Sequence, residues 1–137
     1  MSVTEVKSAR LRDGERTRRE VLSDAYVDGA EAATTDFDAP FQMLITEAAW
    51  GSLWSRKEWT KRERSIVTIS LLAALGHYEE MAMHIRATAR TGATLTDVRE
   101  ALLHVAIYAG VPTANTAFRV AKQVFADMAP GTADDRS

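Results

Sequence analysis

Apolar positions along the chain recur at spacings of three and four residues, and no stretch alternates apolar and polar residues as a strand does. This pattern predicts a helix from Glu15 to about Gly29 and another from Pro40 to about Trp54. The polar residues 31–39 between them are expected to form a loop, and Pro40 suits the first turn of the second helix. Four apolar residues of that helix have core spacing: Phe41, Leu44, Ile45 and Ala48.

The next stretch is the most apolar part of the chain. Residues 60–63 match a capping box, in which the Thr60 hydroxyl accepts from the Glu63 amide and the Glu63 carboxylate reaches back to Thr60. They precede the run from Ile66 to Leu75, which is apolar on nearly every side. Because such a helix is typical of a protein interior, we expect it to form the centre of the domain.

Three further helices are predicted in the remainder of the chain. One spans Tyr78 to Thr91 and stops at Gly92, the next starts at Thr94 or Thr96, and the last follows the break at residues 110–112. The pattern therefore predicts an all-α fold, a single-domain bundle of about six helices.

The predicted organisation is one bundle over residues 14–128, a polar arm over residues 1–13 and a disordered tail over residues 129–137. A chain of 137 residues is long enough for one domain with a core. Its net charge of −2 favours neither nucleic acid nor an anionic membrane as a partner. No signal-peptide core and no spanning run of about 18 apolar residues is seen, so we expect a cytoplasmic location.

The sequence contains no cysteine, which excludes disulfides, Cys-x-x-Cys redox centres and thiolate metal sites. It is rich in alanine, and several predicted helices are apolar on more than one side. For so short a chain, this apolar excess predicts burial between subunits and therefore self-association.

The candidate chemistry lies between residues 47 and 84. His77, Glu80 and His84 fall at i, i+3 and i+7, so one helix face can present all three. One interpretation makes His84 a general acid oriented by Glu80, and another makes it a structural, hydrogen-bonded histidine. A metal face is a third interpretation, although no second carboxylate and histidine pair completes a site.

A second candidate face lies on the helix before it. Glu47, Trp50 and Trp54 also fall at i, i+3 and i+7, which suits either a pocket wall or an oligomer interface. Arg56 and Arg64 flank the turn that follows, and arginine binds carboxylates through two parallel hydrogen bonds. The residues alone thus indicate a pocket for a small anion.

Several separated motifs resemble the carboxymuconolactone decarboxylase family, in the family's order and over about residues 14–128. The resemblance is carried by Trp50–Arg56, Arg62–Ser65, Glu79–His84, Gly92–Thr94 and Tyr108–Pro112, and earlier by Arg18–Leu22 and Ala39–Gln42. Peroxidase members of the family carry two cysteines at the positions of His77 and Glu80, so their chemistry does not transfer. Tyr26 departs from the histidine expected in many relatives.

The resemblance implies a cofactor-free, metal-free carboxy-lyase that converts 4-carboxymuconolactone to 3-oxoadipate enol-lactone in the protocatechuate branch of the β-ketoadipate pathway. It also implies a homohexamer built as a trimer of dimers. As a hypothesis, Arg56 or Arg64 anchors a carboxylate, His84 donates the proton and Glu80 orients it. In the same hypothesis, an apolar wall is formed by Trp50, Trp54 and Phe41. Glu47 repels the departing carboxylate. Arg18 or Arg19 completes the site from the N-terminal helix.

Three alternatives stay open at this point. The first is an enzyme of the same fold that acts on another lactone or oxo acid. The second is a non-catalytic helical assembly protein, whose tryptophans would only cover an interface. The third is an enzyme that binds a metal ion through histidine and glutamate.

Overall fold

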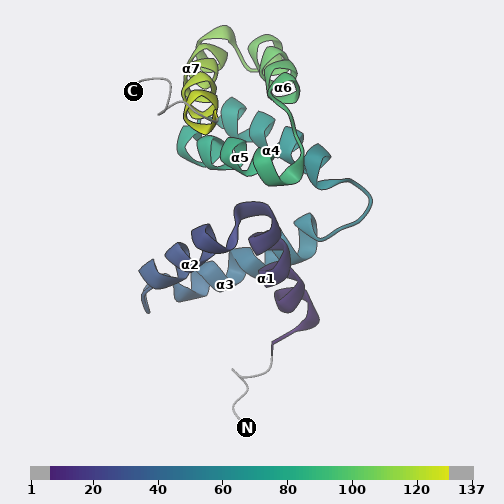
Figure 1. Cartoon of the computed structure of the whole chain (residues 1–137), viewed down its shortest axis with the longest axis vertical. Helices are drawn as coiled ribbons and strands as arrows, with labels where there is room; N and C mark the ends of the chain where they lie inside the picture. Colours follow the sequence, from purple (N-terminus) through teal and green to yellow (C-terminus); the bar gives the residue numbers. More distant parts are fainter. Residues whose placement is uncertain (1–6, 130–137) are drawn as a thin grey trace. The chain divides into compact units, whose positions relative to one another are not determined.

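The computed structural model describes residues 7–129, and every regular element in that range is helical (Figure 1). The predicted all-α fold class is confirmed. In chain order the elements are α1 (Ala9–Leu22), α2 (Asp24–Ala33), α3 (Ala39–Ile45), the π-helix η2 (Thr46–Trp54), α4 (Lys61–Leu75), α5 (Tyr78–Thr91), α6 (Leu95–Tyr108) and α7 (Val111–Met128). Within residues 7–129, no helix has both the length and the apolar character needed to cross a bilayer.

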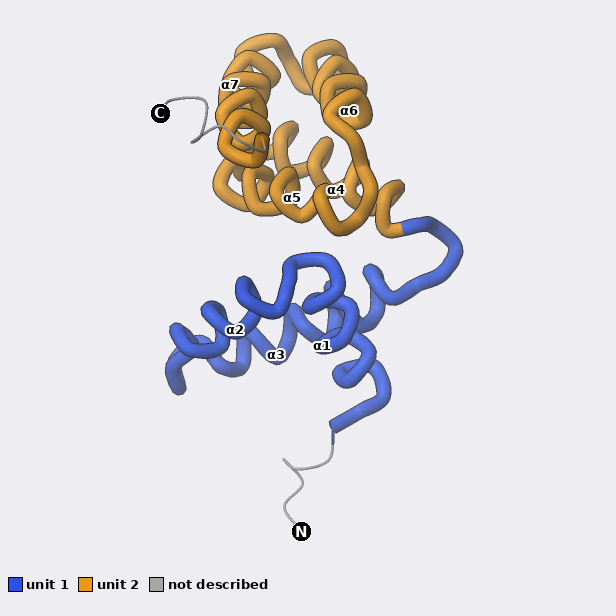
Figure 2. Tube along the Cα trace, viewed as in Figure 1, with its two compact units in different colours: residues 1–60 blue, residues 61–137 orange. Residues whose placement is uncertain are grey.

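The chain divides into two compact units, residues 1–60 and residues 61–137 (Figure 2). The first contains α1, α2, α3 and η2, and the second contains α4 to α7. The single domain over residues 14–128 stays a prediction, and of the predicted arm and tail, residues 1–6 and 130–137 lie outside the described residues.

Unit 1 is organised around the contact of α1 with η2. A Cβ atom built on Gly14 of α1 would lie 2.1 Å from the Thr46 carbonyl oxygen, and one built on Gly51 of η2 would lie 2.3 Å from the Arg10 carbonyl oxygen. Both distances are far below van der Waals contact, so the two helix backbones touch each other directly. Only glycine permits this approach.

The helix predicted over residues 15–29 is two helices in the structure. Ser23, at φ 88°, breaks the chain between α1 and α2, and its hydroxyl caps α2 by accepting from the Tyr26 amide. Ser8 caps α1 in the same way, through the Leu11 amide. Because α1 starts at Ala9, residues 9–13 of the predicted arm are helical.

The predicted helix over residues 40–54 is also divided, since α3 continues into the π-helix η2. Hydrogen bonds in a π-helix reach five residues along the chain, so the buried face shifts to Thr46, Trp50 and Trp54. The prediction of a core stripe through Phe41 and Leu44 is wrong, because both residues lie on α3 and their side chains are 57% and 63% exposed.

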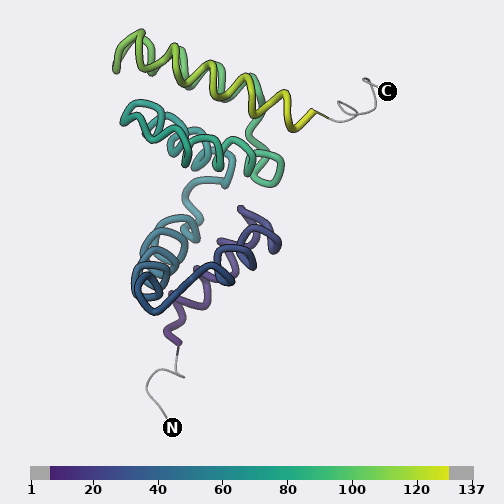
Figure 3. The backbone as a smooth tube through the Cα atoms, turned by 90° about the vertical axis from the view of Figure 1, so that its left-hand side faces the viewer, coloured from purple at the N-terminus to yellow at the C-terminus, as the bar shows by residue number. Residues whose placement is uncertain are grey.

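Unit 2 consists of two helical hairpins, α4 with α5 and α6 with α7, which pack on each other (Figure 3). Their shared core combines large aliphatic residues with alanines, whose small side chains let the helices approach closely. It contains Ile69, Ala73, Met81, Ile85, Val98, Leu102, Val105, Ala114, Ala117, Ala121 and Val124.

Three helix ends of unit 2 follow the predicted signals. Gly92 ends α5 in the left-handed conformation, with φ 89°. Thr94 starts α6 with a complete capping box that includes Asp97. The break before α7 is confirmed at Gly110, with φ 112°. These are positions where local chemistry, independent of packing, decides the boundary.

Helix α4 is not buried on every side, contrary to the prediction. Ile69 and Ala73 are in the core, but Val67, Leu71 and Leu75 are 38%, 57% and 68% exposed. The exposed residues are four apart and form one stripe. The four-helix packing of unit 2 covers one side of α4 and leaves this apolar stripe open.

Candidate active site

His84 is a buried histidine in the middle of α5, with an exposed fraction of 7%. Burial lowers its pKa from the ordinary value of 6.5 to about 4, because the charged imidazolium loses its hydration. The imidazole is therefore neutral at pH 7. A neutral imidazole carries one N–H donor and one nitrogen acceptor.

The other two members of the predicted His84 face lie in a different environment. Glu80 is exposed one turn before His84, and His77 is exposed at the N-cap of α5. Burial alone accounts for the pKa shift of His84. Among residues 7–129, no three histidine, aspartate or glutamate side chains are grouped so as to hold a metal ion. The orienting role of Glu80 stays a prediction.

Arg64 points inward from the first turn of α4 and is only 8% exposed. Next to it in the chain, the fully buried Ser65 hydroxyl shares a 2.7 Å hydrogen bond with Thr91 of α5. Arg62, by contrast, forms two hydrogen bonds of 2.8 and 2.7 Å with Asp97, at the start of α6. This contact lowers the pKa of Asp97 to about 2. In unit 2, Arg62 therefore links α4 to α6, whereas Arg64 is buried.

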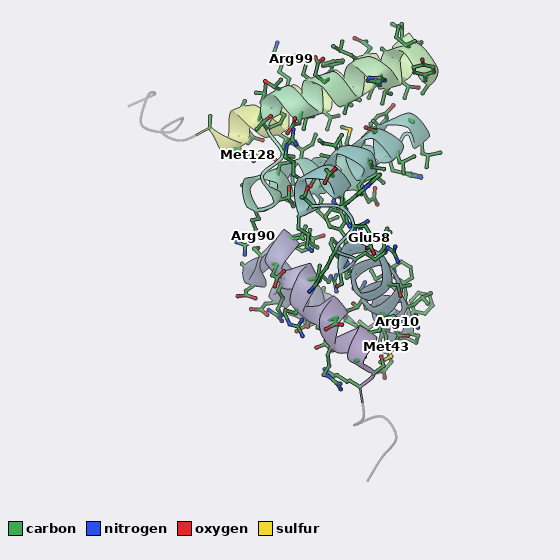
Figure 4. The ribbon with its side chains drawn as sticks, turned by 90° about the vertical axis from the view of Figure 1, so that its right-hand side faces the viewer. Arg10, Met43, Glu58, Arg90, Arg99 and Met128 are labelled. Carbon is green, nitrogen blue, oxygen red and sulfur yellow. The ribbon has the colours of Figure 1, made fainter. Side chains whose placement is uncertain are left out.

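In unit 1, η2 separates the residues of the predicted Glu47 and tryptophan face. Trp50 and Trp54 are buried, with ring centroids 5.1 Å apart and ring planes inclined by 38°. The Glu47 carboxylate accepts from Arg10 at 3.0 Å. Arg10 and Met43, both labelled in Figure 4, line a surface groove together with Glu47. Glu47 thus belongs to this groove.

The two remaining predicted binding residues of unit 1 are exposed. Phe41 lies on α3, and its predicted position in an apolar wall stays a prediction. Arg56 follows η2, is 56% exposed at its side chain and forms an ion pair with Glu58 at 3.6 Å. In this position the Arg56 guanidinium is accessible to solvent, and the neighbouring Glu58 carboxylate partly neutralises its positive charge.

The neighbouring arginines of α1 differ sharply. Arg19 forms ion pairs with three carboxylates of α2, those of Asp24, Asp28 and Glu31, at 3.1, 2.9 and 3.4 Å. Arg18 is 7% exposed and donates to two neutral oxygens. The sequence analysis offered Arg18 or Arg19 and did not distinguish between them. The available signal was that Arg18 follows Gly14 by four residues, on the face of α1 that meets η2.

Comparison with known proteins gives a family match over residues 39–123, to the carboxymuconolactone decarboxylase family. A 4-carboxymuconolactone decarboxylase of Acinetobacter baylyi is 40% identical over 87% of this chain and 89% of its own. This chain belongs to the carboxymuconolactone decarboxylase family. A nitrosuccinic acid decarboxylase of Metarhizium robertsii is 36% identical over 85% of this chain and 81% of its own.

Membership of the carboxymuconolactone decarboxylase family confirms the resemblance inferred from the motifs. It also confirms the predicted enzyme class, a carboxy-lyase, because both relatives are decarboxylases. His84 and Arg64 lie inside the matched region, whereas Arg18 lies before it. The individual roles of the site residues stay predictions.

Burial of His84 predicts that the folded chain loses stability as the pH falls from about 6.5 to about 4. The pKa of His84 is about 4 in the folded chain and near 6.5 when unfolded, so the unfolded chain binds more protons between these values. The stabilising contribution is complete above about pH 6.5 and is lost towards pH 4. Since one pKa unit corresponds to about 1.4 kcal/mol, the loss amounts to about 3 kcal/mol.

Urea unfolding of the wild type and of His84→Asn at several pH values measures this contribution. The variant should lack the His84 component of the pH dependence. Equal losses in both proteins would show that another group is responsible.

Proposed function

We propose that this protein converts 4-carboxymuconolactone to carbon dioxide and 3-oxoadipate enol-lactone, in the protocatechuate branch of the β-ketoadipate pathway and in the cytoplasm. The observation that carries the proposal is the 40% identity, over most of both chains, to a 4-carboxymuconolactone decarboxylase. The alternatives of a metal enzyme and of a non-catalytic assembly protein have no comparable support.

The substrate supplies its own electron acceptor. Its departing carboxylate is bonded to a ring carbon that is conjugated, through a double bond, with the lactone carbonyl. When the carbon–carbon bond breaks, its electron pair delocalises onto that carbonyl oxygen and forms a furan-like enolate. A proton from water then adds to the ring carbon next to the carbonyl. No cofactor is needed in this proposed reaction.

Stabilisation of the enolate oxygen is the main task left to the protein. We assign it to the neutral N–H of His84, in place of the proton transfer expected from the sequence. The reason is electrostatic: a neutral imidazole would have to become an anion in order to give up a proton. A neutral N–H can strengthen its hydrogen bond as charge develops on the oxygen, with no change in its own charge. Anchoring of a substrate carboxylate by Arg64, which is buried in the same unit, stays a prediction from the sequence.

Self-association as a homohexamer, a trimer of dimers, is part of the proposal. Its support within the chain is a set of large apolar side chains that are exposed in unit 2. Leu71, Leu75, Ile107, Tyr108 and Val111 are each more than half exposed. Such surfaces are typical of subunit interfaces.

The proposed reaction can be tested with the purified protein and 4-carboxymuconolactone. The expected result is a change in ultraviolet absorbance as the conjugated lactone is consumed, with one carbon dioxide released per substrate. Addition of a metal chelator should leave the rate unchanged. A protein that is folded but gives no turnover above the uncatalysed rate would rule out this substrate.

Nitrosuccinic acid is a second candidate substrate, favoured by the 36% identity to a nitrosuccinic acid decarboxylase. Both acids contain a succinate unit in which one central carbon bears an electron-accepting group. Loss of the carboxylate from that carbon leaves a stabilised anion in either case, an enolate or a nitronate. Comparison of kcat/KM for the two acids, under the same conditions, decides between them.

A further inference from the structure

Arg18 presents an uncompensated positive charge inside unit 1. Arg18 is 7% exposed, and among residues 7–129 no carboxylate lies within ion-pair distance of its guanidinium. A buried charge is costly unless an opposite charge and hydrogen bonds offset the loss of hydration. The adjacent Arg19, with three carboxylate partners, shows that acidic side chains are available on the same helix pair.

The hydrogen bonds of Arg18 leave most of its capacity unused. Nη1 donates to the Thr46 hydroxyl at 3.4 Å and Nη2 donates to the Gln42 amide oxygen at 3.2 Å, while Nε is buried with no acceptor. A guanidinium has five N–H donors, so three of them are not engaged by these two bonds. Both acceptors are neutral. The Thr46 hydroxyl also donates its own proton to the Gln42 carbonyl oxygen at 2.7 Å.

The surroundings of Arg18 are held rigidly. Gly14 and Gly51 bring α1 into backbone contact with η2, and Arg18 follows Gly14 by one helical turn. Thr46 is the first residue of η2, and its hydroxyl is fixed by the Gln42 carbonyl. π-Helical turns are rare and occur often at functional sites. A rigid guanidinium with unused donors is a preorganised receptor for a planar anion.

We infer that Arg18, with Gln42 and Thr46, forms a binding site for a substrate carboxylate, in which the Gln42 amide oxygen occupies the place of a carboxylate oxygen until the substrate binds. Gln42, whose amide oxygen accepts from Nη2 of Arg18, is itself only half-buried. The inference rests on the proposed function for the identity of the ligand, a dicarboxylate that loses one of its two carboxylates.

The carboxylate held by Arg18 is the one that stays on the product. A guanidinium paired with the departing carboxylate would stabilise the charge that the reaction must lose, and would slow the reaction. A guanidinium paired with the acetate arm binds the substrate and the transition state equally. Loss of such a contact raises KM and leaves kcat nearly unchanged.

Gln42→Glu is the sharpest test, because it adds a carboxylate of nearly the same shape at the position that already accepts from Arg18. The variant should have a higher thermal midpoint than the wild type, since the buried charge gains a partner. Its KM should rise about 10-fold or more, the scale of one charge-assisted hydrogen bond, with kcat within about 3-fold. Gln123→Glu on α7 makes the same chemical change at an exposed position and should leave both kinetic constants as they are.

Arg18→Gln removes the charge itself and should also raise KM by about 10-fold or more. Its control is Arg16→Gln, which removes an exposed arginine from the same helix. If Arg18→Gln does not fold, Gln42→Glu decides alone. A KM of Gln42→Glu within about 2-fold of the wild type would overturn the inference and leave Arg18 as a structural link between α1 and α3.

Thermal unfolding in the presence of succinate, with sodium chloride at equal ionic strength as the control, tests the carboxylate site independently of the proposed reaction. Succinate should raise the thermal midpoint of the wild type but not that of Gln42→Glu. If the wild type does not turn over 4-carboxymuconolactone and this difference is nevertheless seen, the proposed substrate fails and the carboxylate site stands. If the wild type turns over and succinate affects both proteins equally, the carboxylate site fails alone.

Discussion

Replacement of His84 by alanine is expected to lower kcat for decarboxylation about 100- to 1000-fold, the usual result of removing one hydrogen-bond donor to a developing oxyanion. The donor acts only once the electron pair has moved onto the lactone oxygen, so KM should change much less than kcat. Steady-state kinetics at pH 7 measure both constants. Because the change also leaves a cavity in the core, circular dichroism and the thermal midpoint must show that the variant is folded at the assay temperature.

His84→Gln separates the two roles that a histidine can take here. Glutamine offers an amide N–H of similar reach but cannot transfer a proton, so it should recover part of the activity lost in His84→Ala. A proton donor would leave the two variants equally inactive. In the wild type, kcat/KM should be constant above about pH 5 and fall at lower pH as the imidazole of the free enzyme becomes charged. A kcat/KM that instead decreases as the pH rises from 5 to 7 would indicate that the charged form is required.

Gly14→Ala is expected to lower the free energy of unfolding by about 3 kcal/mol or more, at the upper end of the effects of overpacking. The added methyl group would lie 2.1 Å from a backbone oxygen of η2, and a backbone cannot move aside as a flexible side chain can. The matched control is Gly29→Ala in α2, where no atom other than those of the adjoining residues and the helix's own backbone lies within 4 Å of the added Cβ. This change should stabilise the chain by up to about 1 kcal/mol, the difference in helix propensity.

Urea unfolding at pH 7 compares these two variants with the wild type. A loss below about 1 kcal/mol for Gly14→Ala would mean that α1 and η2 can separate at little cost. In that case the contact between α1 and η2 would not hold Arg18 rigidly.

The sequence predicted unit 2 better than unit 1, and the difference has a physical cause. Gly92, Thr94 and Gly110 set helix ends through their own conformational preferences and hydrogen bonds, which a local pattern contains. Serine rarely adopts positive φ, so the residue type at position 23 did not indicate the break between α1 and α2. The π-helix has no comparable signal, and it changed which residues of the stretch 40–54 are buried.

The candidate site shows the same limit. The motifs identified His84, but only its burial reveals that the imidazole is neutral, and this changes the role we propose for it. Arg18 and Arg19 are adjacent and identical in type. Only the packing of α1 shows that one faces η2 and the other the acidic residues of α2.

The glycine contact between α1 and η2 also limits how this site can diverge among relatives. Positions 14 and 51 are already occupied by the smallest residue, so the spacing of the two helices cannot decrease, and any side chain added at either position forces them apart. With the helix spacing kept, shorter side chains at Gln42 or Thr46, which both accept from Arg18, are one way to make room for a larger or differently shaped acid. Substrate preference in this part of the protein is expected to vary through those two positions, while the helix pair itself stays constant.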